Sequence, residues 1–257
     1  MVTIERLLHR RSDLSTFLVH LTREGTEDED ARENLLRILG SRTVEARRAM
    51  GMASRLDPYL NGSTADQRVV CFSETPLEHV WMMTEQIDGR TINFSKYGLV
   101  ITKTTARRKG CNPVWYLDIT PGHDWLTVPV NRLVEDALAA VTDPATLEVD
   151  AVALADKPIL KITPFIEQIG PTHTSKKEFW WEREWRHVGN FRFFGGQVVA
   201  LLAPESDHAS LRQAVETLGG PWAKQTPPIL DPIWGLERMI GAMSGIDEDQ
   251  LGPFPES

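Results

Sequence analysis

The order of apolar and polar positions along the chain predicts strands mixed with helices. Seven segments are apolar, β-branched or alternating in the manner of strands: 14–22, 69–72, 97–102, 114–117, 159–162, 181–188 and 197–202. Four segments are expected to be helical: 31–39, 131–141, 208–218 and 231–243. This mixture favours an α+β fold with one main domain, residues 1–204, and a helical C-terminal appendage packed on it, residues 205–257.

Two expected helices have specific end signals. Gly40 stands where a C-cap glycine would end the helix over 31–39. Thr75, Pro76 and Glu78 have the spacing of a capping box with a proline in the first helical position. A helix is therefore expected directly after the strand over 69–72.

Composition limits the class of protein. The 257 residues carry 28 Lys and Arg against 36 Asp and Glu, a net charge of −8. That balance excludes a protein that is basic overall, such as one that coats DNA, but allows a local basic patch. Two cysteines are too few for a disulfide framework or a four-cysteine zinc site. The first residues lack the apolar stretch of a secretion signal and no apolar run reaches 18 residues, so we expect a cytoplasmic protein that does not enter a membrane.

The strongest chemical signal is the segment Glu182-Arg183-Glu184-Trp185-Arg186-His187. On a strand, residues two apart face the same side, so Glu182, Glu184 and Arg186 would share one face. One interpretation is a solvated strand face whose charges pair with one another. The other is a functional site, because Trp180, Trp181 and Trp185 indicate partial burial and charged groups are seldom buried unless paired or functional.

Two further motifs have a structural and a functional interpretation. His20-Leu21-Thr22 ends an apolar strand, where a histidine is more often structural than functional. Ser73 and Thr75 follow another strand and could present hydroxyl and backbone N–H groups to a ligand, or could simply cap a helix.

Several common sites are excluded or disfavoured. The sequence has no glycine-rich phosphate loop, no dinucleotide fingerprint and no nucleophile elbow. The potential zinc ligands Cys71, Cys111, His123 and His173 lack any ligand spacing, so no metal site is expected.

Taken in order, these motifs resemble the ADP-ribosyltransferase superfamily. Its histidine-type branch has a His-x-Thr motif on a first strand, an aromatic residue on a helix after a second strand, and a glutamate that begins a late strand. The chain has His20-Leu21-Thr22, then Val70-Cys71-Phe72-Ser73 leading to Trp81, then Glu184. The helix over 33–40 is similar to one in the DarT-type DNA ADP-ribosyltransferases.

The closest resemblance is to the AbiGi-like family of abortive phage resistance proteins. It rests on five phrases in order, at residues 17–22, 70–77, 96–100, 110–114 and 181–189. Members of that family are labelled the antitoxin half of their system.

The superfamily resemblance implies a split-sheet core that uses NAD as a substrate. His20 would hydrogen-bond the adenosine ribose, the backbone beside it at Leu21 would bind the nicotinamide amide, and Thr22 would support both. Glu184 would bind the nicotinamide ribose and stabilise the positive charge that develops when the glycosidic bond breaks.

Further roles follow from the same resemblance. Trp81 would stack on nicotinamide, with Tyr97 as the reserve, and Ser73 would lie at the cofactor site. Glu182 would lie nearer the acceptor, as in the Glu-x-Glu pair of the arginine-type branch. One arginine would also enter the site, from among Arg42, Arg47, Arg48 and Arg55.

The acceptor and the biological role stay open. Basic residues at 103–109 and 176–177 near aromatic residues suit single-stranded nucleic acid, whereas a protein acceptor is the alternative. The leading hypothesis is an NAD-dependent ADP-ribosyltransferase toxin of a phage-defence or toxin–antitoxin system, without a metal. A second is a non-catalytic antitoxin that binds and neutralises a partner protein through its tryptophans and C-terminal helices. A third is hydrolysis of NAD without a macromolecular acceptor.

Overall fold

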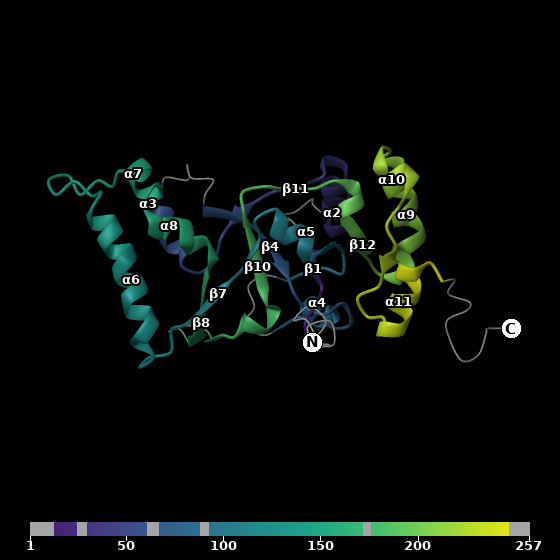
Figure 1. Cartoon of the computed structure of the whole chain (residues 1–257), viewed down its shortest axis with the longest axis horizontal. Helices are drawn as coiled ribbons and strands as arrows, with labels where there is room; N and C mark the ends of the chain where they lie inside the picture. The colour runs from purple at the N-terminus through teal and green to yellow at the C-terminus, as the bar shows by residue number, and fades with distance from the viewer. Residues whose placement is uncertain (1–12, 25–29, 61–66, 88–92, 172–175, 247–257) are drawn as a thin grey trace, which may run out of the picture. The chain divides into compact units, whose positions relative to one another are not determined.

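A computed structural model describes residues 13–24, 30–60, 67–87, 93–171 and 176–246. The chain divides into two compact units (Figure 1). The first unit comprises residues 1–43, 72–108 and 192–257, and the second comprises residues 44–71 and 109–191. The expected domain division at residue 204 stays a prediction.

The first unit is built on strands that the apolar pattern predicts. The strand β1 (Phe17–Leu21) pairs antiparallel with β5 (Gly98–Thr102) along its whole length. On the other side of β5 lies β12 (Val198–Leu202), which is antiparallel to β5 and parallel to β13 (Ile229–Leu230). The apolar side chains of β5 and β12 are almost all buried, which explains why their sequences are nearly continuous apolar runs.

Helices complete the first unit. They are α2 (Ala31–Ser41), α4 (Trp81–Thr84), α5 (Lys103–Arg108), α9 (His208–Thr217), α10 (Pro221–Lys224) and α11 (Leu236–Ser244), with short 3₁₀ turns η3 (Leu77–His79), η6 (Gly195–Gln197) and η7 (Glu205–Asp207). The indole N–H of Trp222 on α10 donates to the carbonyl of Leu39 on α2 over 3.1 Å. This bond fixes the buried indole of α10 against α2.

The second unit contains part of the eight-stranded sheet to which β1, β5, β12 and β13 also belong, and a three-stranded sheet of its own. The strand β4 (Arg68–Ser73) pairs with β3 (Arg47–Arg48) and with β10 (Glu184–Val188), and β10 pairs antiparallel with β6 (Asn112–Pro113). The last two residues of β4 belong to the first unit, where Ser73 pairs with Val19. A three-stranded sheet joins β7 (Trp115–Asp118) to β8 (Ile166–Pro171) in parallel, and β8 to β9 (Lys176–Lys177) antiparallel. Where the chain passes between units, β2 (Thr43–Val44) pairs with β11 (Phe191–Arg192).

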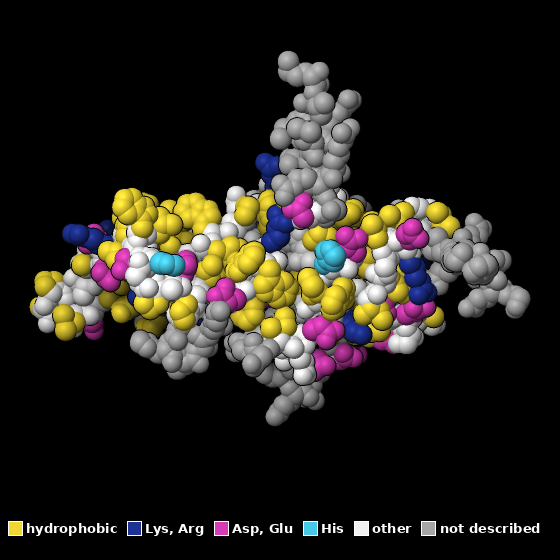
Figure 2. Space-filling model, turned by 90° about the horizontal axis from the view of Figure 1, so that it is seen from below, with side chains coloured by type: hydrophobic (Ala, Val, Ile, Leu, Met, Phe, Trp, Pro, Cys, Tyr) yellow, Lys and Arg dark blue, Asp and Glu magenta, His cyan; other side chains and the backbone are white. Residues whose placement is uncertain are grey.

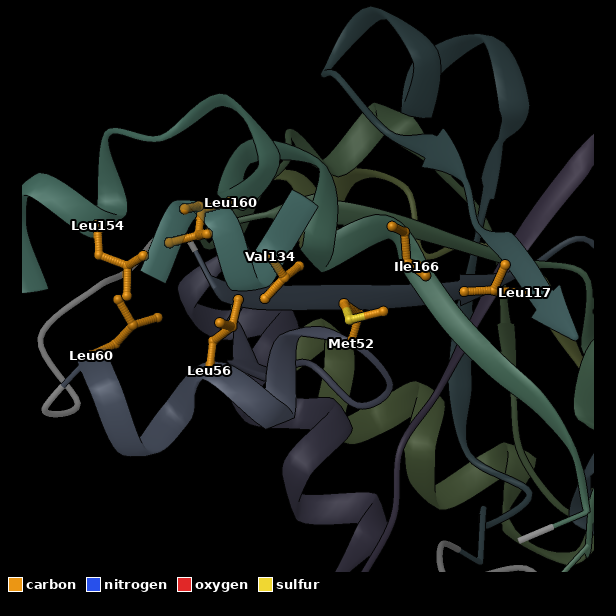
Figure 3. Packing of buried hydrophobic residues seen from close by; sticks show 9 residues of the cluster. Met52, Leu56, Leu60, Leu117, Val134, Leu154, Leu160 and Ile166 are labelled. Atoms are coloured by element: carbon orange, nitrogen blue, oxygen red, sulfur yellow. The ribbon is translucent and has the colours of Figure 1, made fainter. Parts of the chain in front are cut away.

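The core of the second unit lies among its helices. These are η1 (Ala53–Leu56), α3 (Asp57–Leu60), α6 (Asp124–Ala139), α7 (Ala151–Ala155), α8 (Pro158–Ile162), η4 (Thr163–Phe165) and η5 (Phe179–Glu182). Figure 1 shows α3, α6, α7 and α8 grouped together. Figure 3 shows their buried side chains meeting, with contributions from both strands of the parallel pair: Met52, Leu56, Leu60, Leu117, Val134, Leu154, Leu160 and Ile166.

Most predicted strands are confirmed, but the strand over 159–162 is wrong. These residues form the helix α8, with Pro158 in its first turn. Leu160 is fully buried whereas Ile162 is exposed, so the segment presents one apolar stripe to the core. Four residues, three of them apolar, are too few positions to distinguish a strand from a buried helix.

The predicted helix ends also need correction. The 3₁₀ turn η3 begins after Pro76 without a side-chain cap, and the Thr75 hydroxyl instead lies 2.8 Å from that of Ser73, so there is no capping box. Gly40 lies inside α2, which ends at Arg42 in the left-handed conformation. The helix expected over 131–141 begins seven residues earlier, at Asp124, and α11 begins at Leu236 rather than near 231.

The expected mixture of helices with open mixed sheets is confirmed. The finer expectation, a core specific to ADP-ribosyltransferases, stays a prediction.

Candidate functional site

The most elaborate polar cluster surrounds Arg186, in the middle of β10. Its side chain is only 2% exposed. The guanidinium donates to both carboxylate oxygens of Glu184, each over 2.9 Å, and to the carboxylate of Glu167 over 2.7 Å. A fourth bond, of 2.8 Å, goes to the carbonyl of Pro164. Four of the five N–H groups of Arg186 therefore donate to charged or polar partners.

Three elements bring these partners together. Glu184 begins β10 and lies two residues before Arg186, so both side chains fall on one face of the strand. Glu167 is on β8 and Pro164 on η4, which lead directly into each other. Both glutamate side chains are largely covered, with 17% and 14% exposure for Glu184 and Glu167. Each buried carboxylate has the guanidinium as a partner of opposite charge, which is the condition for keeping ions out of water.

Electrostatics keep Arg186 charged. Burial by itself lowers the pKa of its guanidinium, but the neighbouring negative groups, Glu184 first among them, outweigh this and raise the pKa above its ordinary value. The cluster therefore keeps its positive centre around neutral pH.

A glycine allows the backbone to approach this cluster closely. Gly51 has a φ of +74°, and a Cβ there would lie 2.5 Å from the carbonyl oxygen of Ile166 and 2.9 Å from a carboxylate oxygen of Glu167. The following N–H, of Met52, donates to the same Ile166 carbonyl over 3.1 Å. The turn at Gly51 thus holds β8, and with it Glu167, against the segment that begins η1.

Two more groups lie beside Glu184. The backbone N–H of Glu184 donates to the hydroxyl of Tyr116 over 2.8 Å, and burial together with the charges of Glu184 and Glu182 raises the pKa of that phenol. The Cys71 side chain reaches solvent, yet desolvation by the surrounding protein, and then the charge of Glu184, raises the pKa of its thiol well above the usual value. Cys71 is therefore a thiol rather than a nucleophilic thiolate near neutral pH.

The expected side-by-side placement of Glu182 and Glu184 on one strand is wrong. Residues 179–182 form the 3₁₀ turn η5, and Arg183 follows it in the left-handed conformation with a φ of +48°. The strand begins only at Glu184, so the period of two does not extend back to Glu182. The left-handed backbone of Arg183 changes the direction of the chain between η5 and β10. The alternating pattern of the sequence does not predict that turn.

The His-x-Thr motif lies in the first unit, on β1. The His20 ring lies 5.7 Å from the ring of Phe72, at a tilt of 60°, and Leu21 pairs in register with Gly98. The Thr22 hydroxyl donates to the carbonyl of Ala31 over 2.8 Å, and the Thr22 N–H donates to that of Tyr97 over 2.8 Å. Thr22 therefore ties the end of β1 to the start of α2 and to the segment before β5.

The other expected NAD-binding residues are also in the first unit. The Ser73 hydroxyl accepts from the Thr75 N–H over 3.2 Å and pairs with the Thr75 hydroxyl, so it shapes the turn after β4. The Tyr97 hydroxyl donates to Asp207 in η7, and burial followed by this bond raises the pKa of the phenol. Trp81 is 41% exposed on α4. Glu182 and Glu184 belong to the second unit, so the expected residues are divided between the two units.

The four candidate arginines serve different local structures. Arg42 is the C-cap of α2. Arg47 and Arg48 form β3 and make exposed ion pairs with Glu45 and Asp57, and Arg55 donates to the side-chain oxygen of Asn131 over 2.8 Å. The arginine that contacts Glu184 is instead Arg186. From the sequence, Arg186 was expected only to share a strand face with that glutamate.

Sequence reasoning missed Glu167, Pro164 and Gly51. All three precede the motif by many residues, and no spacing rule links them to Arg186. The available signal was an arginine next to Glu184 among tryptophans that indicate burial. A buried guanidinium requires more than one carboxylate or carbonyl partner, so further partners from elsewhere in the chain could have been expected.

Within the described ranges, no group of three or more His, Cys, Asp and Glu side chains is placed to hold a metal ion. His173, one of the weak zinc candidates, lies outside the described residues. No helix in the described part of the chain is long and apolar enough to span a membrane.

Comparison with known proteins places the chain in one family. No curated protein and no solved structure matches it. Residues 55–214, more than half of the chain, match the family described as “Putative abortive phage resistance protein AbiGi, antitoxin”. The matched region includes Glu167, Glu184 and Arg186, whereas the His20 motif precedes it. The chain therefore belongs to the AbiGi family of abortive phage resistance proteins.

Proposed function

We propose that this protein is a non-catalytic antitoxin that binds a partner protein and neutralises it. The family carries this proposal, because its description assigns the antitoxin part of an abortive phage resistance system. An antitoxin needs a stable binding surface rather than a reactive centre.

The geometry at Glu184 supports a structural role for that carboxylate. A glutamate that stabilises a developing positive charge must present its oxygens to the reacting atoms. Here both oxygens of Glu184 accept hydrogen bonds from Arg186, and the guanidinium compensates the charge. The Glu184 carboxylate therefore orients the Arg186 guanidinium, which links β10 to β8 by its bond to Glu167.

The test is neutralisation of a toxic partner in cells. The product of the adjacent gene in the source genome would be induced alone, and then together with this chain, and colony counts would be compared. We expect growth arrest in the first case and recovery in the second, with a stable complex of the two purified proteins. Failure of the wild-type chain to restore growth, together with no binding in solution, would refute the antitoxin proposal.

A matched substitution separates binding from catalysis. Glu184→Gln keeps the shape of the side chain and removes its charge, so a non-catalytic antitoxin that stays folded should still restore growth. Circular dichroism and the urea midpoint of the variant provide the control for folding.

The second candidate is an NAD-dependent ADP-ribosyltransferase, with nucleic acid as the acceptor. It is favoured by His20 and Phe72, which present adjacent rings on paired strands, and by Glu184 as the first residue of a strand. Purified protein would be incubated with NAD labelled in the adenylate, with single-stranded DNA, RNA or lysate protein. Label in an acceptor, abolished by Glu184→Gln and by His20→Ala, would establish this candidate. Free ADP-ribose as the sole product would indicate hydrolysis of NAD.

A further inference from the structure

The helix α6 in the second unit has two apolar faces, of which only one is used by the core. Val134 (Figure 3) and Ala137 are buried in the core cluster. Val130 and Leu138 on the helix, and Val141 just beyond its end, pack against that cluster. These positions recur every three or four residues, which is the spacing of one helical face. This face explains why the helix docks on α8 and β7.

The second apolar face of α6 is open to solvent. Trp125 is 88% exposed, Leu126 is 59% exposed and Leu133 is 54% exposed. Trp125, Pro129 and Leu133 are four residues apart, and Leu126 precedes Leu133 by seven, so they form one stripe along the helix. On the adjoining strand β7, Trp115 is 64% exposed. Figure 2 shows hydrophobic side chains at the surface at the end of the picture where α6 lies.

This stripe lies in the most acidic part of the chain. Residues 118–156 contain eight Asp or Glu and one arginine, a net charge of −7 in a protein whose total is −8. All eight acidic side chains are exposed: Asp118, Asp124, Glu135, Asp136, Asp143, Glu148, Asp150 and Asp156. We call residues 118–156, with the exposed stripe of α6, the acidic apolar surface.

Only part of this charge is needed by the fold. Asp150 caps α7, Asp118 and Asp143 accept backbone N–H groups in turns, and Asp136 lies 4.0 Å from Arg132. The carboxylates of Glu135 and Glu148 make no hydrogen bond or ion pair with the described residues. Exposed carboxylates repel one another, so this excess has a small energetic cost that the folded chain alone does not recover.

We propose that the acidic apolar surface is the docking site for a partner protein with a basic surface around an apolar pocket. This inference rests on the proposed antitoxin function and names the part of the chain that performs it. Charge complementarity identifies the partner's chemistry, since a segment with eight exposed carboxylates and a net charge of −7 disfavours an acidic partner and attracts a basic one. The basic surface is of the kind that proteins use to hold the phosphates of nucleic acid.

The two components of the surface have different parts in binding. Trp125 and the leucines of the stripe can enter a pocket and lose their exposure, and tryptophans in such positions carry much of the binding energy in interfaces. The carboxylates of residues 118–156 steer the encounter and set its dependence on salt. A second copy of this chain is a poor occupant, because it would oppose two copies of the same acidic segment.

The experiment measures binding of the purified product of the adjacent gene by biolayer interferometry, at about 50 and 300 mM NaCl. The variants are Trp125→Ser with Leu133→Ser, and Glu135→Lys with Glu148→Lys. We expect the apolar pair to weaken binding about 30-fold or more at both salt concentrations. The charge-reversal pair should slow association most strongly at low salt.

Matched controls lie in the first unit. Ile240 is 52% exposed on α11, so Ile240→Ser matches Leu133→Ser in burial and in element. Glu85 and Glu216 are exposed, so Glu85→Lys with Glu216→Lys matches the charge change. Both controls should bind as the wild-type chain does. Thermal unfolding of all variants tests whether they are folded.

The outcomes separate this inference from the proposed function. If the wild-type chain neutralises and binds the partner but the two variant pairs do so equally well, the docking site is elsewhere and the antitoxin proposal survives. If the wild-type chain neither binds nor neutralises, both fall. If light scattering finds a wild-type dimer that Trp125→Ser with Leu133→Ser converts to a monomer, the stripe is an interface between copies and the proposal is wrong.

Discussion

Arg186 holds Glu184 through two parallel hydrogen bonds, from Nε to Oε1 and from Nη2 to Oε2, each 2.9 Å long. The residues are two apart on β10, so the strand itself places them on one face. The same Nη2 also reaches Glu167 on β8 over 2.7 Å. A pair that is local in sequence thereby becomes a link between two strands.

Removal of Arg186 should be strongly destabilising. In Arg186→Met the carboxylates of Glu184 and Glu167 would stay largely covered without a positive partner, which costs about 3–5 kcal/mol of unfolding free energy. Urea denaturation of the variant measures this. Arg132→Ala is the control, because it removes an exposed ion pair on α6 that is worth about 0–1 kcal/mol. Equal midpoints for the two variants would contradict the structural role of the cluster.

The close approach at Gly51 can be tested against a glycine of the same conformation. Gly51 and Gly189 both have a φ of +74°, but a Cβ at Gly189 would meet no atom within 4 Å. Alanine at either position bears the cost of the left-handed conformation, about 1–2 kcal/mol. Gly51→Ala should cost about 1–3 kcal/mol more, because it collides with β8. Urea denaturation gives the change in unfolding free energy for each variant. A difference near zero would show that β8 moves to accommodate the added Cβ without cost.

The two cysteines should react slowly with alkylating reagents. Cys111 is buried, and desolvation raises the pKa of its thiol to about 12. Cys71 is accessible, but its thiol pKa is raised as well, by desolvation and then by the charge of Glu184. Iodoacetamide labelling at pH 7.5, followed by mass spectrometry, should be slower for both than for a free thiol. Glu184→Gln should accelerate labelling of Cys71 and leave Cys111 unchanged.

Asp118, which precedes α6, should titrate at unusually low pH. Hydrogen bonds from Thr120, and then from His123, lower the pKa of this exposed carboxyl to about 2. Because the folded pKa is below the unfolded value, the carboxylate stabilises the fold above about pH 4, and this contribution is lost as the pH falls toward 2. Carbon-detected NMR titration should find the low value, and Thr120→Val should raise it. An unchanged pKa in that variant would exclude the hydroxyl as the main cause.

The strands of the first unit follow from local pattern. The runs that become β1, β5 and β12 are apolar over nearly their full length, because both faces of a central strand are covered. An apolar run of this kind that is five or more residues long has few alternative structures besides a buried strand. The shorter segment at 159–162, Ile-Leu-Lys-Ile, becomes a helix, and Pro158 before it favours a helical start.

Less of the Arg186 site than of the strands can be predicted from the sequence. A charged segment with flanking tryptophans is visible in the sequence, and the pairing of Glu184 with Arg186 follows from their spacing once a strand is assumed. The exclusion of Glu182 from that strand depends on the left-handed Arg183, which no local preference for arginine predicts.

The amino-acid sequence by itself determined the mixed α and β composition, the central strands, the family and the segment that contains Arg186, because each of these is encoded by neighbouring residues. Only the tertiary structure decided that Glu167 shares the Arg186 guanidinium, that Gly51 must approach β8, and that one apolar face of α6 is left exposed to solvent. The first two relationships join residues far apart in the chain. Their energies depend on which groups lose their water together, and that is settled by packing rather than by local sequence.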